Sequence, residues 1–214
     1  MLTVAVRVGV LSGKGGSGKT TLSINLARAI ELDGNEVVVV DTDPQKTAKT
    51  WAGSRSEGYG LPVRHVSESG ADTLEERIRR LSDDADLAVI DGAAKIEGAT
   101  GAAVRASHVV LIPVQPTPAD TWGARSVVEV VKETNTTAAI VITRQIVGTN
   151  LAAEVADGLR RFGLPVFDSR MSQRVAFAES MFDGKTVLDL SGADKAKSEI
   201  QGIATELAQL LSQS

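Results

Sequence analysis

Short runs of apolar residues alternate along the chain with longer segments in which apolar positions recur every three or four residues. The short runs are continuous, which is typical of parallel strands covered on both faces. They predict strands at residues 4–11, 36–40, 87–90, 109–114 and 138–142, with weaker candidates at 63–66 and 165–167. The longer segments predict helices at residues 19–32, 46–51, 72–81, 98–106, 119–133, 151–162, 173–181 and 194–211. This alternation predicts one α/β domain over residues 1–214, a doubly wound, mostly parallel sheet with helices on both faces.

Composition excludes several kinds of site. The chain of 214 residues contains no cysteine, which excludes disulfides, thiolate metal sites and a cysteine nucleophile. Its two histidines, His65 and His108, are far apart in sequence, which argues against a histidine metal site. The net charge of −4 provides no general field for nucleic acid and leaves only a local basic patch. No apolar run approaches the ~20 residues of a membrane-spanning helix, so we expect a cytoplasmic protein.

Residues 13–20 match the phosphate-binding pattern G-x-x-x-x-G-K-[ST], between the first predicted strand and the first predicted helix. Glycines let backbone N–H groups point at phosphate oxygens, and a helix N-terminus favours negative charge. Lys19 would place a positive charge beside the β- and γ-phosphates, and the Thr20 hydroxyl would bind Mg²⁺. We therefore expect ATP and Mg²⁺ as cofactors. The expected nucleotide-binding residues of this loop are Gly13, Lys14, Gly15, Gly16, Ser17, Gly18, Lys19, Thr20 and Thr21.

Carboxylates follow two of the predicted strands. Asp41 and Asp43 come after residues 36–40, and Asp91 comes directly after residues 87–90. Ligands of such sheets bind outside the carboxyl ends of the strands, so we expect all three near the phosphate loop. Asp91 completes a Walker B pattern and would hold Mg²⁺ through water. Of Asp41 and Asp43, one can face the metal and the other the attacking water, although a carboxylate here can instead cap the next helix.

The sequence K-G-G-S-G-K-T-T at residues 14–21 resembles the phosphate loop of the deviant Walker A ATPases, the ParA/MinD family. The sequence D-T-D-P-Q at residues 41–45 resembles a second motif of these proteins. The resemblance implies that Lys14 reaches across a dimer interface to phosphates bound by the partner subunit, where it also neutralises charge during phosphoryl transfer. It further implies that Asp43 positions the attacking water and that Asp41 supports the water shell of Mg²⁺. Lys14, Lys19 and Asp43 are thus the expected catalytic residues.

The resemblance extends from residue 8 to about residue 190. Arg144, after the strand at 138–142, and Met171, at the start of a later motif, stand where relatives contact the adenine. The Gly-Ala-Ala sequence at residues 92–94 departs from larger relatives and looks like the small plasmid-partition branch. These positions add two expected base contacts, Arg144 and Met171.

Other branches of the family fit less well. The last predicted helix has no Lys or Arg after Lys197, which argues against the membrane-binding helix of MinD. The absence of cysteine argues against nitrogenase-type and arsenite or tail-anchor ATPases, and the single Tyr59 argues against bacterial tyrosine kinases. The phosphate loop begins at residue 13, so we expect no N-terminal DNA-binding domain. The short ParA branch remains as the expected one.

That branch implies an ATP-dependent homodimer that binds DNA non-specifically on the nucleoid, with no membrane contact. ATP hydrolysis would be slow until a ParB-like partner stimulates it. We expect the cycle to segregate a plasmid or chromosome. One alternative keeps the same ATPase cycle but positions a protein cargo, such as a chemoreceptor cluster or a carboxysome. A less favoured one is a metabolic ligase of the dethiobiotin synthetase type, which Lys14 and the Asp41–Asp43 pair disfavour. The candidate DNA contacts are basic residues of the C-terminal third: Arg160, Arg161, Arg170, Arg174, Lys195 and Lys197.

Overall fold

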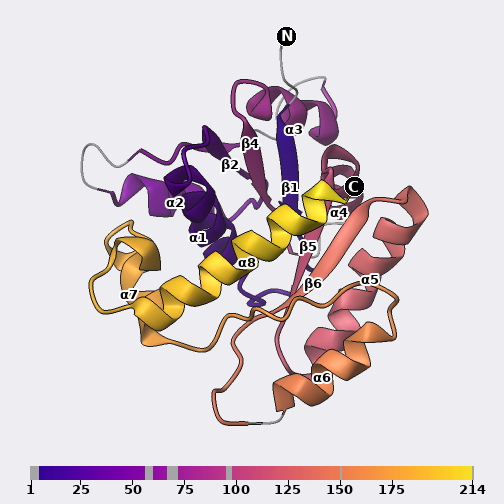
Figure 1. The fold of residues 1–214 in the computed structure, drawn as a ribbon. Helices are drawn as coiled ribbons and strands as arrows, with labels where there is room; N and C mark the ends of the chain where they lie inside the picture. The colour runs from indigo at the N-terminus through magenta and orange to yellow at the C-terminus, as the bar shows by residue number, and fades with distance from the viewer. Residues whose placement is uncertain (1–4, 56–59, 67–71, 95–97, 150, 214) are drawn as a thin grey trace.

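The computed structural model describes residues 5–55, 60–66, 72–94, 98–149 and 151–213, and in them six parallel strands form one sheet (Figure 1). The strands are β1 (Val6–Val10), β2 (Val37–Asp41), β3 (Val63–His65), β4 (Leu87–Asp91), β5 (Val109–Val114) and β6 (Thr137–Ile142). Their order across the sheet is β3-β2-β4-β1-β5-β6. The predicted fold class, a doubly wound parallel sheet, is confirmed.

Helices cover both faces of the sheet. They are α1 (Lys19–Leu32), α2 (Thr47–Gly53), α3 (Leu74–Ser82), α4 (Ala99–Ala106), α5 (Pro118–Thr134), α6 (Leu151–Arg160), α7 (Val175–Phe182) and α8 (Asp194–Ser212), with a 3₁₀ turn η1 (Val187–Asp189). One hydrophobic core lies between the sheet and α1, α2, α7 and α8, and a second lies between the sheet and α3–α6. Figure 1 shows α8 lying across the first of these faces. No helix in the described part of the chain is long and apolar enough to cross a membrane.

The strand candidate at residues 165–167 is wrong. This segment forms a single bridge, between Ile140 of β6 and Val166. Pro165 has no N–H group to donate, and it contributes only its carbonyl, which accepts from the Ile140 amide (2.8 Å). After the Phe167 amide donates to the Ile140 carbonyl (2.9 Å), the next two amides turn to Glu206 of α8. The segment therefore leaves β6 after one pair and returns to it at Met171, whose amide donates to the Ile142 carbonyl (2.9 Å).

The register of the sheet brings three sequence motifs to one edge. Val10, the last residue of β1, is paired with Asp91 of β4, and Asp91 is paired with Asp41 of β2. The phosphate loop follows β1 directly, because Val10 is separated from α1 by only eight residues. The glycine-rich loop and the two strand-end carboxylates are therefore neighbours, as expected for motifs at the carboxyl ends of parallel strands.

Candidate functional site

The loop between β1 and α1 is held from its outer side. Gly16 and Gly18 have φ of 81° and 87°, a left-handed conformation that favours glycine. The Gly16 carbonyl accepts a hydrogen bond from Gln115 Nε2 (2.6 Å), and the Ser17 carbonyl accepts one from Thr143 Oγ1 (2.7 Å). A phosphate cradle needs this arrangement, because its N–H groups must face the ligand while its carbonyl groups bond elsewhere.

We expect the loop to tolerate alanine at Gly15 but not at Gly13. A β-carbon at Gly13 would lie 2.5 Å from Ser126 Oγ and 2.7 Å from the Gly123 carbonyl of α5, whereas at Gly15 it would meet nothing within 4 Å. Gly13→Ala should therefore lower the free energy of unfolding by about 1–3 kcal/mol, and Gly15→Ala by less than about 0.5 kcal/mol. Urea unfolding of the nucleotide-free protein measures both changes. Equal effects would show that the loop does not rest against α5 as described.

Lys19 begins α1 with its ammonium group inside the loop. Its Nζ donates to the Lys14 carbonyl (3.2 Å), and the residue is 7% exposed. Burial lowers the pKa of Lys19, while the negative charges of Asp91 and Asp43 act in the opposite direction. An ammonium group has three donors, so this one has two left for a ligand within the described site. Lys19 can therefore meet phosphate oxygens without breaking its contact with the loop.

Asp91 ends β4 and is completely buried. Its Oδ1 accepts a hydrogen bond from Ser23 Oγ (3.2 Å), and its Oδ2 has no partner among the described residues. Burial raises the pKa of Asp91 to about 7 and the charge of Asp41 acts in the same direction, while Thr20, Lys19 and Ser23 lower it. The carboxylate and the Thr20 hydroxyl are the hard oxygen groups that suit Mg²⁺ and its water shell. These residues therefore fit the cation expected with a bound nucleotide.

We expect Asp91→Asn to stabilise the nucleotide-free protein in a pH-dependent way. The pKa of Asp91 is about 7 in the folded chain, above its ordinary value of about 3.9, so the folded state binds more protons between these limits. Asp91 therefore costs stability progressively as pH rises from about 4 to 7. The variant should gain up to ~4 kcal/mol at pH 8 and little at pH 4. Denaturant unfolding in EDTA at several pH values measures this gain, and a gain that does not vary with pH would contradict the prediction.

Asp41 and Asp43 shape the turn between β2 and α2. The buried Asp41 accepts the Asp43 amide at Oδ1 and the Lys49 amide at Oδ2, each at 3.0 Å. The half-buried Asp43 accepts the Gln45 amide at Oδ1 (2.9 Å). Asp41 thus makes the capping contacts that were the alternative to a metal role. Its support of Mg²⁺ and the positioning of water by Asp43 both stay predictions.

Lys14 is bound by an acid of its own chain. Its Nζ donates to Asp120 Oδ2 (2.6 Å), which also accepts from Thr117 Oγ1 (2.6 Å). The Asp120 side chain is 2% exposed, whereas that of Lys14 is 36% exposed. Gly123 lets α5 approach, since a β-carbon there would lie 3.2 Å from the β-carbon of Lys14. In this structure the predicted trans lysine is therefore held in cis against α5.

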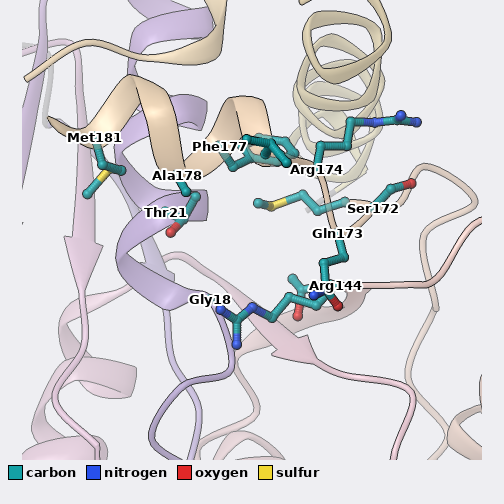
Figure 2. A pocket seen from close by; sticks show the side chains of 12 residues that line it. Gly18, Thr21, Arg144, Ser172, Gln173, Arg174, Phe177, Ala178 and Met181 are labelled. Carbon is teal, nitrogen blue, oxygen red and sulfur yellow. The ribbon is translucent and has the colours of Figure 1, made fainter. Parts of the chain in front are cut away.

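A cavity of about 430 Å³ opens beside the phosphate loop (Figure 2). Its size is within the usual range for small-molecule sites. Gly18, directly before α1, and Thr21 of α1 line one side, and α7 faces the cavity with apolar side chains. Both predicted base contacts, Arg144 and Met171, line it. The other lining residues are Thr143, Ser172, Gln173, Arg174, Val175, Phe177, Ala178 and Met181.

The structure does not bring the six candidate DNA contacts into one patch. Arg160 pairs with Asp157, and Arg174 pairs with Glu199 (2.6 Å). Arg161 and Lys195 are exposed, while Arg170 and Lys197 are partly buried. The end of α6 and the start of α8, which carry most of this set, lie at opposite sides of the view in Figure 1. Their role in DNA binding stays a prediction.

Several residues of the site were not predicted from the sequence. Asp120 is 106 residues from Lys14, and Gln115 is 99 residues from Gly16, so no local pattern links them. The Thr117-x-x-Asp120 spacing marks a helix start, where the Thr117 hydroxyl accepts the Asp120 amide (3.2 Å), but not an ion pair. The helix at α7 was predicted, whereas the face that Phe177 and Met181 turn to the cavity was not.

Comparisons to known proteins agree with the fold and with the motifs of the sequence. Residues 8–187 match the CobQ/CobB/MinD/ParA nucleotide binding domain. A maintenance of carboxysome distribution protein A from Gloeobacter kilaueensis is 31% identical over 94% of this chain and 93% of its own length. A protein with the same name from Halothiobacillus neapolitanus is 26% identical, over 95% and 96%. The chromosome-partitioning ATPase Soj from Thermus thermophilus is 29% identical, over 85% and 86%.

Solved structures agree in fold. The ATP complex of a McdA variant from Cyanothece has a TM-score of 0.76 at 15% identity, covering 96% of this chain and 97% of that one. MinD from Pyrococcus horikoshii with Mg-ADP has a TM-score of 0.75 at 17% identity, covering 97% of each chain. The domain match spans both the phosphate loop and the strand-end carboxylates. The chain therefore belongs to the CobQ/CobB/MinD/ParA nucleotide-binding family and is a P-loop ATPase of the ParA/MinD type.

Proposed function

We propose that this ATPase distributes a protein assembly, of the carboxysome class, over the nucleoid of the cell. ATP and Mg²⁺ bind the phosphate loop, two copies then associate around the bound nucleotides, and the dimer binds DNA without sequence preference. A partner protein carried by the cargo stimulates hydrolysis and releases the dimer from DNA. The observation that carries the choice of cargo is the almost end-to-end similarity to two carboxysome distribution proteins.

The residues divide the chemistry between them. Lys19 and the loop amides bind the phosphates, and Thr20 and Asp91 would hold Mg²⁺, which supplies positive charge to the reacting phosphate group. Asp43 orients the attacking water. Lys14 leaves Asp120 and contacts the nucleotide of the second copy. Trp122, two residues after Asp120, is 75% exposed, which is unusual for tryptophan and supports an interface on this part of α5.

Segregation of DNA is the second candidate, and it was the expectation from the sequence. The Soj relative from Thermus thermophilus and a ParA protein from Rhizobium radiobacter, 26% identical over 58% of this chain, support it. The ATP-dependent cycle of dimerisation and hydrolysis is the same in both cases, so residues of the ATP site do not distinguish the two cargoes. The longer coverage by the carboxysome relatives favours the protein cargo.

Deleting the gene in its host distinguishes the cargoes. We expect labelled protein assemblies to lose their even spacing and gather into few clusters, while plasmids and chromosomes are inherited normally. Loss of DNA inheritance with normally spaced assemblies would replace the first proposal with the second. Complementation with Asp43→Ala, which should bind ATP without hydrolysing it, should not restore the spacing.

ATP-dependent dimerisation and DNA binding are tested with purified protein. Sizing chromatography should give a dimer with ATP and a monomer with ADP, and Asp43→Ala should remain a dimer with ATP. Co-sedimentation with DNA at low salt should depend on ATP, and the binding should weaken steeply as salt is added. A monomeric Asp43→Ala protein with ATP would contradict the sandwich dimer, and ATP-independent DNA binding would contradict the cycle.

A further inference from the structure

One wall of the cavity beside the phosphate loop is an irregular segment without its own secondary structure. This wall segment (residues 168–174) begins after the bridge that Val166 forms with Ile140 of β6, and it ends where α7 starts. On its inner side the Met171 amide donates to the Ile142 carbonyl (2.9 Å), and Gln145 exchanges backbone hydrogen bonds with Met171 and Gln173 (3.1 and 2.9 Å). These contacts tie one side of the wall segment to the end of β6.

Glu199 of α8 holds the other side of the wall segment. Its Oε2 accepts the Ser172 amide (3.0 Å), and its Oε1 accepts the Ser172 hydroxyl (2.6 Å). The same Oε1 accepts Nε and one terminal nitrogen of Arg174 (3.0 and 2.6 Å). Figure 2 shows Ser172, Gln173 and Arg174 as successive residues of the cavity wall, with Arg174 extending away from the cavity. One carboxylate therefore fixes two wall residues by four hydrogen bonds.

Helix α8 can act as a fixed support for this contact. Ile200, the residue after Glu199, and Ile203 are completely buried in the core that α8 shares with α1. Gly202 lets the wall segment lie close to the helix, because a β-carbon there would lie 2.3 Å from Ser169 Oγ. The Glu199 side chain is 15% exposed, so the contact is largely shielded from water. Charge-assisted hydrogen bonds of this kind are the stronger ones in proteins.

A second glutamate of α8 makes a comparable contact outside the cavity. Glu206 accepts the Asp168 amide at Oε2 (2.9 Å) and the Ser169 amide at Oε1 (2.7 Å). Neither Asp168 nor Ser169 lines the cavity, whereas Ser172 and Arg174 do. The helix thus holds the wall segment at two points, of which only one reaches the cavity.

We propose that Glu199 is a positioning residue for the base of the bound nucleotide, because it fixes Ser172 and Arg174 in the wall of the cavity beside the phosphate loop. The proposal rests on the proposed function, since it takes this cavity as the site of the base. Ligand affinity is sensitive to such pre-organisation, because an unfixed wall must be ordered at the moment of binding. The C-terminal helix then sets the affinity for the nucleoside part, and the phosphate loop sets the affinity for the phosphates.

The test compares a ligand that has a base with one that has none. We expect Glu199→Ala to weaken binding of ADP with Mg²⁺ about tenfold, and to leave binding of inorganic tripolyphosphate with Mg²⁺ unchanged, both measured by calorimetry. Glu199→Gln keeps one acceptor oxygen, for the Ser172 amide, but turns an NH2 group toward the Ser172 hydroxyl and Arg174, so its loss should be smaller than that of Glu199→Ala. In steady-state assays the KM for ATP should rise while kcat changes little.

Glu206→Gln is the matched control, since it disturbs the same helix and the same segment away from the cavity. It should lower stability as Glu199→Gln does but leave ADP affinity unchanged. A loss by Glu199→Ala that is equal for ADP and tripolyphosphate, or an equal loss of ADP affinity in Glu206→Gln, would overturn the positioning role. Ala178→Trp fills the cavity from α7, and it distinguishes the claim that the base binds in this cavity from the claim that Glu199 positions its wall. If Ala178→Trp weakens ADP binding while Glu199→Ala does not, only the role of Glu199 fails. If ADP binding is unchanged in Ala178→Trp, the cavity is not the site of the base.

Discussion

Lys19→Ala is expected to abolish binding of ATP and ADP. Lys19 is 7% exposed, and its ammonium group lies within a loop that offers it one carbonyl, so its charge acts on phosphate oxygens in a site with little water. A neutral alanine leaves the loop amides to hold three phosphates alone. We expect the affinity for ATP to fall by a factor on the order of 100 or more.

Calorimetry with ATP and Mg²⁺ measures this loss, and thermal unfolding provides the control for folding. Saturating ATP should stabilise the native protein by about 2.7 kcal/mol at 100 times the Kd, and should not stabilise the variant. The exposed Lys132 of α5 offers a matched change, because Lys132→Ala removes the same charge away from the loop. ATP binding by Lys19→Ala at the native affinity would exclude the loop as the phosphate site.

The fold was predictable because its signals are local. Continuous apolar runs give the parallel strands, and the motif after each run falls at the same edge of the sheet because parallel strands share a direction. The strand order places β4 between β1 and β2, so Asp91 lies between the phosphate loop and Asp41 without any sequence pattern that states it. The failed strand at 165–167 shows the limit of this reasoning, since β-propensity does not tell that the next two amides bond to a glutamate of α8 instead of β6.

The residues of the site that were not predicted are those whose role depends on a contact with a residue far away in the sequence. Glu199 reads as an ordinary polar position on an amphipathic helix, and only its contacts with Ser172 and Arg174 give it a place beside the cavity. Asp120 reads as a helix-start carboxylate, and only its contact with Lys14 connects it to the loop. Arg174 was grouped with candidate DNA contacts on charge alone, whereas its charge is paired. Local patterns therefore predicted the phosphate-loop motif better than the side-chain contacts around it.

Lys14→Ala is expected to keep nucleotide binding and to lose both ATP-dependent dimerisation and hydrolysis. In this structure Lys14 contacts Asp120 rather than the inside of its own loop, so the cradle formed by Lys19 and the loop amides does not need it in cis. The charge that Lys14 would bring to a second copy is absent in the variant. If the lysine acts as a cation on the transferring phosphate group, hydrolysis should fall by a factor on the order of 10³, the size of an arginine-finger effect.

The ion pair between Lys14 and Asp120 supplies a control that separates the role of Lys14 at the dimer interface from its effect on the stability of the chain. Removing Lys14 alone leaves the Asp120 carboxylate buried and unpaired, with its Oδ1 already lacking a partner among the described residues, so Lys14→Ala should also lower the stability of the nucleotide-free chain. Adding Asp120→Asn removes the uncompensated charge, and the double variant should regain stability without regaining the ATP-dependent dimer or the hydrolysis rate. Recovery of hydrolysis in the double variant would show that Lys14 acts only by neutralising Asp120. Normal hydrolysis in Lys14→Ala itself would contradict the role across the dimer interface.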